Sequence, residues 1–249
     1  MTLVSLHDVT VAYDGCIVLN RVNLEIGDSD FIGVIGPNGG GKTTLVKTIV
    51  GVLPYSGSID FTPALFRGSQ RLIGYMPQQT KFDRAFPISV REVVMSGLQS
   101  GHGFWSRYTS NDRKKVSALL EMAGINDIAD NQISEISGGQ LQRAMLCRAV
   151  ITEPKLLILD EPANFVDNRF ENELYTMLKQ LNEHMAIVMV SHDIGTITSV
   201  VKEIVCVNRT VHRHHSNIIT EEQLQNYNCP IQIISHGNIP HTVLEHHDH

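Results

Sequence analysis

A glycine-rich loop at residues 36–43 constrains the fold of this chain more than any other feature. The loop reads Gly-Pro-Asn-Gly-Gly-Gly-Lys-Thr and fits the pattern G-x-x-x-x-G-K-S/T. The apolar run at 31–35 comes directly before it, and residues 43–52 follow it with helical spacing until Leu53-Pro54. A buried strand, a tight loop and a helix in this order are typical of a phosphate-binding loop in an α/β protein.

The residue types of this loop suit the binding of phosphate groups. Glycines leave room for backbone N–H groups to surround phosphate oxygens, and the N-terminus of the following helix attracts the same anion. The ammonium group of Lys42 can reach the β- and γ-phosphates of a nucleotide, and the hydroxyl of Thr43 can bind Mg²⁺. The residues predicted to bind the nucleotide here are Gly36, Asn38, Gly39, Gly41, Lys42, Thr43 and Thr44.

Two further apolar runs end in polar residues. Residues 156–159 lead into Asp160 and Glu161, and residues 186–190 lead into Ser191-His192. Since α/β sheets bind ligands beyond the carboxyl ends of their parallel strands, we expect these side chains to lie beside the phosphate-binding loop. The carboxylate of Asp160 is suited to hold Mg²⁺ through water, because Mg²⁺ usually keeps several of its waters. The sequence therefore predicts a site for a nucleotide and Mg²⁺.

The stretch Ser137-Gly138-Gly139-Gln140 lies between the loop and the Asp160 run. With this stretch, the chain resembles the ATP-binding-cassette (ABC) ATPases over roughly residues 3–207. In that family the serine and the glycines reach the γ-phosphate of an ATP molecule held by the opposite subunit. The resemblance therefore implies ATP as the nucleotide, a second copy of the chain as partner, and ATP-binding roles for Ser137, Gly138, Gly139 and Gln140.

The resemblance also implies roles for single residues. Glu161 matches the residue that polarises the attacking water, and His192 matches the histidine that bonds the γ-phosphate. Gln78 matches a glutamine that joins or leaves the metal shell, with the adjacent Gln79 as an alternative. Asp167 matches an aspartate that touches the partner subunit. The implied catalytic residues are Glu161, His192 and Lys42, and the implied Mg²⁺ ligands are Thr43, Gln78 and Asp160.

One residue is implied in binding the base of the nucleotide. Tyr13, in Val-Ala-Tyr-Asp, matches the aromatic residue that stacks on adenine in the ABC family. Stacking on an aromatic ring suits any base, because every base has a flat face. A tyrosine in a strand is also often packed in a core, so this alternative stays open for Tyr13.

The predicted fold class is α/β: a P-loop NTPase core with a mainly parallel sheet, an antiparallel N-terminal β subdomain and a helical insert, as in ABC nucleotide-binding domains. Alternating apolar and polar residues at 3–26 predict the antiparallel strands, and helical spacing predicts an insert at roughly 85–150. The ATPase domain is expected at residues 1–207, and a histidine-rich tail of weaker order is expected at 208–249.

Local patterns predict the remaining elements. Asn111 or Ser110 is suited to cap the helix that follows it. The elements are strands at 72–76 and 204–207, helices at 89–99, 111–123 and 169–183, a loop at 101–105, and a helix that begins just after Gly139 and runs to about residue 150.

Composition excludes several classes of protein. The net charge is −6 and the pI is about 6.0, so no general electrostatic footprint for nucleic acid is present, and no nucleic-acid partner is expected. The sequence contains neither an apolar run long enough to cross a bilayer nor an N-terminal secretory signal. The four scattered cysteines suit a reducing cytosol. With the resemblance, these observations predict a peripheral protein on the cytoplasmic face of a bacterial membrane.

Weaker features concern the transported substrate. The stretches at 83–90, 165–168 and 206–209 resemble the branch of ABC importers that takes up zinc or manganese. The siderophore-uptake branch shares much of this pattern, and a soluble ABC ATPase of the cluster-assembly type is a further alternative. The importer interpretation implies an integral membrane permease as direct partner and an extracytoplasmic metal-binding protein as indirect partner.

The predicted tail is rich in histidine. Imidazole suits zinc, copper and nickel, and the spacing His-x-His can supply two ligands. One hypothesis is a segment that senses cytosolic metal and slows import, and the alternative is a solvated tail with incidental histidines. The histidines concerned are His212, His214, His215, His236, His241, His246, His247 and His249.

Overall fold

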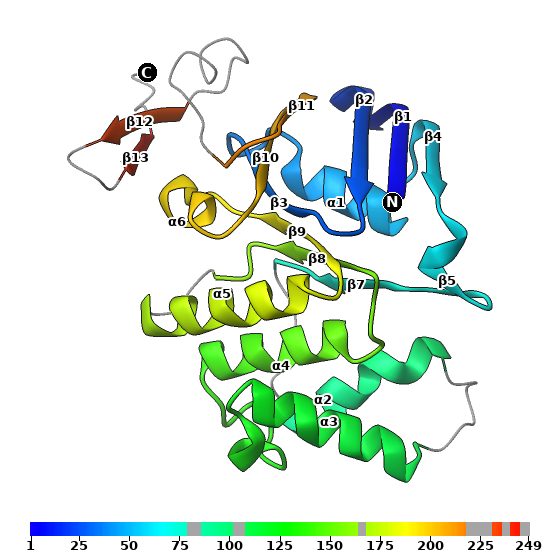
Figure 1. The fold of residues 1–249 in the computed structure, drawn as a ribbon, viewed down its shortest axis with the longest axis vertical. Coiled ribbons are helices and arrows are strands. Elements are labelled where there is room, and N and C mark those ends of the chain that lie inside the picture. Colours follow the sequence, from blue (N-terminus) through cyan, green and yellow to red (C-terminus); the bar gives the residue numbers. More distant parts are fainter. Residues whose placement is uncertain (79–85, 102–107, 164–167, 218–230, 236–239, 245–249) are drawn as a thin grey trace.

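The computed structural model describes residues 1–78, 86–101, 108–163, 168–217, 231–235 and 240–244. Strands gather in one half of the molecule and most helices in the other (Figure 1). Two hydrophobic cores lie on opposite faces of a central sheet. One core is shared with the N-terminal strands, and the other is shared with the helical half of the chain.

The central sheet confirms the predicted parallel arrangement. It has six strands, in the order β11-β10-β3-β9-β8-β7. Neighbouring strands are parallel except β10 and β11, which form an antiparallel pair. Every residue of β3, β8 and β9 is buried, as expected for strands that are covered on both faces. The bounds are β3 (Phe31–Ile35), β7 (Ile73–Met76), β8 (Leu156–Asp160), β9 (Ala186–Val190), β10 (Glu203–Asn208) and β11 (Thr210–His214).

The N-terminal antiparallel sheet is also confirmed. Its strands are ordered β2-β1-β4, and the turn between β1 and β2 contains Gly15 at φ 81°. Helix α1 (Lys42–Val50) contributes Leu45, Val46 and Ile49 to the core that this sheet shares with the central one. The bounds are β1 (Thr2–Tyr13), β2 (Cys16–Gly27) and β4 (Ser56–Phe61), and a small hairpin follows with β5 (Phe66–Arg67) and β6 (Gln70–Arg71).

The predicted helical insert contains α2 (Val90–Met95), α3 (Ser110–Met122) and α4 (Gly138–Val150). Helix α2 ends earlier than expected and continues as a 3-10 segment at Ser96–Gly101. The N-cap of α3 is Thr109, not Asn111 or Ser110, because Asp112 three residues later completes a reciprocal pair of bonds with Thr109. Helix α4 begins at Gly138, so both glycines belong to its first turn. Most of the predicted loop at 101–105 lies outside the described residues.

Two further helices pack against the central sheet, α5 (Asn168–Asn182) at β9 and α6 (Ile194–Thr198) at β3. Helix α5 agrees with the helix predicted at 169–183, whereas the short helix α6 was not predicted. Within the described residues, no helix is both long enough and apolar enough to span a membrane.

The sequence predicts a tail of weaker order directly after the strand at 204–207, and for residues 210–214 this is wrong. Strand β11 pairs with β10 across a turn at Arg209, whose φ is 60°, and β12 (Ile231–Ser235) and β13 (Pro240–Leu244) form a separate antiparallel hairpin. The polar, histidine-rich composition of 210–214 gives no local strand signal, because Val211 is its only apolar residue. The predicted division between domain and tail at residue 207 therefore falls within a β-hairpin, and we propose that the ATPase domain includes β11.

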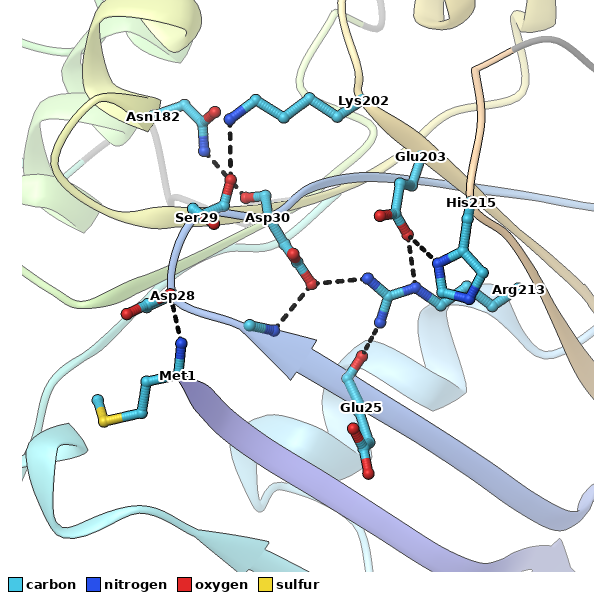
Figure 2. Close-up of polar contacts among 11 residues, drawn as sticks. Met1, Glu25, Asp28, Ser29, Asp30, Asn182, Lys202, Glu203, Arg213 and His215 are labelled. Atoms are coloured by element: carbon cyan, nitrogen blue, oxygen red, sulfur yellow. Dashed lines mark hydrogen bonds and ion pairs between the residues drawn. The ribbon is translucent and has the colours of Figure 1, made fainter.

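Arg213 of β11 contacts three other segments: β2, the turn before β3, and β10 (Figure 2). Its guanidinium lies 2.6 Å from a carboxylate oxygen of Glu203 and 2.9 Å from one of Asp30, and it also donates to the backbone carbonyl of Glu25. The side chains of Arg213, Asp30 and Glu203 are only 19%, 16% and 24% exposed. Asp30 also accepts from the backbone N–H of Gly27 at 2.8 Å. Arg213 thus ties β11 to the end of β2 and to the turn before β3.

Replacing Arg213 with methionine should lower the free energy of unfolding by about 2 kcal/mol, because two partly buried carboxylates lose their cationic partner. The measurement is urea denaturation at neutral pH. Arg113→Met serves as the matched control, since Arg113 is exposed on α3. Equal stabilities of the two variants would show that the Arg213 contacts contribute nothing to the fold.

Candidate functional site

The carboxyl ends of β3, β8 and β9 meet at one edge of the central sheet. Val190 of β9 pairs in register with Val34 of β3 and with Asp160 of β8. The alignment continues past the strands, because the N–H of Glu161 donates to the Val190 carbonyl at 3.0 Å. The glycine-rich loop, Glu161 and His192 therefore begin at neighbouring strand ends.

The glycine-rich loop, residues 36–43, connects β3 to α1. Gly36 has φ 148°, and a Cβ atom there would lie 2.0 Å from the Val207 carbonyl oxygen, so only glycine fits. Gly41 is the N-cap of α1. Asn38 and Gly39 are exposed at the tip of the loop. The loop thus presents its tip to solvent while its base is packed against β10.

The Lys42 side chain folds back over this loop. Its Nζ donates to the carbonyls of Gly36 at 2.8 Å and Pro37 at 3.0 Å, and the residue is 6% exposed. Thr44 is also buried, in the first turn of α1. The ammonium group of Lys42 is therefore held at the mouth of the loop by neutral carbonyl groups, which are weaker partners for it than an anion.

Asp160 and Thr43 are joined across the site. The Thr43 hydroxyl donates to Asp160 Oδ1 at 3.1 Å, while Asp160 Oδ2 is buried without a hydrogen-bond partner. Asp160 is 1% exposed, and burial raises the pKa of its carboxyl group above the ordinary value of 3.8, although the Thr43 bond acts in the opposite direction. A buried carboxylate with an unused oxygen beside a hydroxyl fits the oxygen ligands that Mg²⁺ prefers.

Glu161 accepts a hydrogen bond from Gln78 and lies near His192. Gln78 Nε2 donates to Glu161 Oε2 at 2.6 Å, and His192 Nδ1 is 3.7 Å from the same oxygen. The Glu161 side chain is 11% exposed, whereas that of His192 is 60% exposed. Glu161 also has φ 54°, a left-handed backbone conformation that glutamate rarely adopts. Such strain often accompanies function, because the surrounding structure must hold the residue in place.

A cavity of about 190 Å³ lies behind Glu161 and His192. Glu171, Tyr175 and Asp193 contribute to its polar lining. Since one water occupies about 30 Å³ in the liquid, the cavity has room for several waters beside Glu161.

The Ser137–Gln140 stretch caps helix α4. The Ser137 hydroxyl accepts from the Gln140 N–H at 3.3 Å, and the Gln140 side chain accepts from the Ser137 N–H at 2.9 Å. Ser137 and Gly138 are exposed, and a Cβ atom at Gly138 would meet nothing within 4 Å. Packing within one chain therefore does not require glycine at position 138.

Of the two remaining predicted residues, the structure describes Tyr13 but not Asp167. Tyr13 is the last residue of β1 and is 44% exposed, so its ring is not buried in the core. Asp167 lies outside the described residues, as does Gln79, the alternative to Gln78.

The histidines of the predicted tail are only partly described. His214 is 7% exposed, and burial together with the neighbouring His212 lowers its pKa, while His215 lies 3.2 Å from Glu203. Among the described residues, no three His, Cys, Asp or Glu side chains are placed to hold a metal ion. Metal sensing by the tail stays a prediction. Only the backbone of His241 is described, and the residues outside are His236, His246, His247 and His249.

Some features of the site were missed in the sequence. The spacing Ser-x-x-Gln at 137–140 matches a capping box and could have predicted the bonds at the start of α4. The left-handed conformation of Glu161 and its bond to Gln78 leave no local signal, because they depend on how strands far apart in sequence are placed.

Comparison with known proteins finds relatives over most of the chain. A family model described as ABC transporter matches residues 19–164. A probable metal transport system ATP-binding protein of Chlamydia pneumoniae is 38% identical over 197 residues, which cover 78% of this chain and 80% of that protein. The zinc import ATP-binding protein ZnuC of Marinobacter nauticus is 38% identical over 212 residues, which cover 84% and 76%.

The fold has a close counterpart among solved structures. An inward-facing ABC transporter, provisionally described as of metal-chelate type, has a chain that superposes with a TM-score of 0.83 at 22% identity. The superposition covers 98% of each chain. At this level of identity the likeness concerns the fold alone.

Replacing Asp160 with asparagine should raise the free energy of unfolding of the ligand-free protein by about 1 kcal/mol near pH 7, because a buried charge disappears. Because the pKa of Asp160 is raised in the folded protein, its protonated form favours folding at pH values below the ordinary pKa of 3.8. This contribution to the free energy of unfolding is lost as the pH rises through the folded-state pKa. The gain should therefore shrink near pH 4. Urea denaturation at both pH values tests this, with the exposed Asp127→Asn as control. A less stable Asp160→Asn protein at neutral pH would contradict it.

Proposed function

The chain belongs to the ABC transporter family of ATPases, and we propose that it is the ATP-hydrolysing subunit of an importer of divalent transition-metal ions, zinc or manganese. The meeting of the glycine-rich loop, Asp160 and Glu161 at one sheet edge supports the ATPase most strongly. For the cargo, the support is similarity: relatives named for metal transport and zinc import match more than three quarters of this chain and of their own lengths.

The proposed nucleotide site starts at the glycine-rich loop. Lys42 exchanges its two carbonyl partners for phosphate oxygens, which are charged and therefore stronger acceptors. Backbone N–H groups from Asn38 to Thr44 surround the phosphates, at the positive end of α1. The exposed ring of Tyr13 stacks on adenine, an interaction worth about 1–3 kcal/mol per base in nucleic-acid complexes.

The proposed Mg²⁺ ligands are Thr43, Asp160 and Gln78. Thr43 and Asp160 already lie within hydrogen-bonding distance, and Gln78 donates through its Nε2 to Glu161, so its amide oxygen is the atom that suits a metal ion. When bound, Mg²⁺ neutralises negative charge on the phosphates. Binding requires the charged form of Asp160, which burial disfavours in the ligand-free protein.

Glu161 and His192 are the proposed catalytic pair. The Glu161 carboxylate orients the attacking water and accepts its proton, and the adjacent cavity provides room for that water. His192 lies close to the same carboxylate oxygen and is exposed enough to reach a γ-phosphate. The Gln78 amide competes with a water for Glu161 Oε2, so the bond between the two side chains can influence how the water is held.

A second copy of the chain completes the proposed site. The Ser137–Gln140 stretch, in which Ser137 and Gly138 are exposed, offers the N-terminus of α4 to a γ-phosphate held by the partner chain. The absence of a local packing reason for glycine at 138 supports a close approach from outside the chain. ATP binding would therefore close two chains together, and hydrolysis would release them.

The importer assignment places the protein beside a membrane permease. The transport systems for which the relatives are named support a separate integral membrane protein as the translocation path. The dimer would bind that permease on the cytoplasmic face, and an extracytoplasmic metal-binding protein would deliver the ion. Selection between zinc and manganese then lies mainly with those partners.

Glu161→Gln should trap an ATP-bound dimer, because ATP binds and closes the two chains while the water is no longer activated. Light scattering after size-exclusion chromatography with ATP and Mg²⁺ measures the mass. Adding Gly138→Asp to this variant should return it to a monomer without loss of stability, since the new side chain meets nothing in its own chain. A monomeric Glu161→Gln protein, or a dimer unaffected by Gly138→Asp, would contradict the model.

The cargo is tested by uptake of radioactive zinc and manganese in the natural host at limiting metal concentration. Deleting the gene should reduce uptake of at least one of these ions to background, and wild-type protein should restore it. Lys42→Ala should not restore uptake, because the phosphate-binding ammonium is lost, whereas the control Arg113→Met should. Unchanged uptake of both ions after deletion would overturn the metal-importer assignment while leaving the ATPase intact.

A further inference from the structure

Tyr75 of β7 shares a sheet face with Asp160. Tyr75 pairs in register with Ile158 on β8, and Asp160 follows Ile158 by two residues, so all three side chains point to the face covered by α1. With about 3.3 Å per residue and about 4.8 Å between strands, the Cα atoms of Tyr75 and Asp160 are roughly 8 Å apart. A tyrosine side chain spans most of that distance.

Two polar atoms on this face are buried without hydrogen-bond partners: the Tyr75 hydroxyl and Asp160 Oδ2. Buried polar groups normally have partners, and an unmade bond is costly. The two atoms are chemically complementary. A tyrosine hydroxyl keeps its proton at neutral pH and is a donor, while the carboxylate is an acceptor.

We propose that Tyr75 is a positioning residue for the Mg²⁺-binding carboxylate: its hydroxyl donates a hydrogen bond to Asp160 Oδ2 in the nucleotide-loaded protein. A small shift of the ring or one bridging water completes the bond. This inference rests on the proposed function, since it concerns the site that Thr43 and Asp160 form for the metal ion.

The bond has a specific consequence for metal binding. A donor at Oδ2 gives the buried carboxylate a second partner and fixes the plane of the carboxyl group, so that Oδ1 faces Thr43. Because Gln78 follows β7 by two residues, one short segment carries both a proposed metal ligand and the residue that orients another one.

Tyr75→Phe removes only the hydroxyl and tests the proposal. In a Glu161→Gln background, which prevents hydrolysis, the Mg²⁺ concentration needed for half-maximal ATP binding should rise by about tenfold, as is usual when the partner of a metal ligand is removed. ATP binding in the presence of a chelator should not change. The free energy of unfolding without ligand should not fall, because the hydroxyl has no partner in the ligand-free protein. Tyr55→Phe, at a 40% exposed tyrosine, is the matched control.

The outcomes separate the proposals. An unchanged Mg²⁺ requirement in a protein that binds Mg²⁺ and ATP would overturn the role of Tyr75 and leave the proposed function standing. A loss of ligand-free stability that accounts for the weaker binding would show a merely structural role and would also overturn it. If the Tyr75-containing protein binds no ATP with Mg²⁺, the proposed function fails and this inference fails with it.

Discussion

The register between parallel strands is the constraint on which the rest of the site depends. Val190 fixes β3 on one side and β8 on the other, so that the chain leaves all three strands at the same height. The hydrogen bond between Thr43 and Asp160 depends on this alignment, since 117 residues separate the two in sequence. The hydrophobic burial of three short strands is thus what brings a hydroxyl, a carboxylate and an ammonium group to one edge.

The strands and the polar residues at their ends could be predicted from the sequence, because a short apolar run that ends in polar residues is typical of a buried parallel strand. The contacts between those residues could not. The bond between Gln78 and Glu161 requires β7 to lie beside β8, and strand order is a property of the whole chain. The same holds for the left-handed backbone of Glu161, which the bond to Val190 helps to hold.

The errors of prediction have two physical origins, one local and one tertiary. At the start of α3, three neighbouring polar residues could each serve as cap, and the reciprocal bond between Thr109 and Asp112 decides among them. In β11, composition suggested a solvated tail, yet partners elsewhere in the fold hold the strand: Glu203 on β10 and Asp30 before β3 bind Arg213. Tertiary contacts of this kind override local preference.

The β10–β11 hairpin contacts the glycine-rich loop, although none of its side chains is predicted to bind the nucleotide. The Val207 carbonyl lies against Gly36, and the Arg209 N–H donates to the Gly40 carbonyl at 3.0 Å. The Arg209 carbonyl in turn accepts from the N–H of Asn20 on β2 at 2.7 Å. This turn therefore forms a wall of the glycine-rich loop and joins it to the strand pair that carries Tyr13. Backbone groups of the hairpin therefore connect the glycine-rich loop with the β1–β2 strand pair.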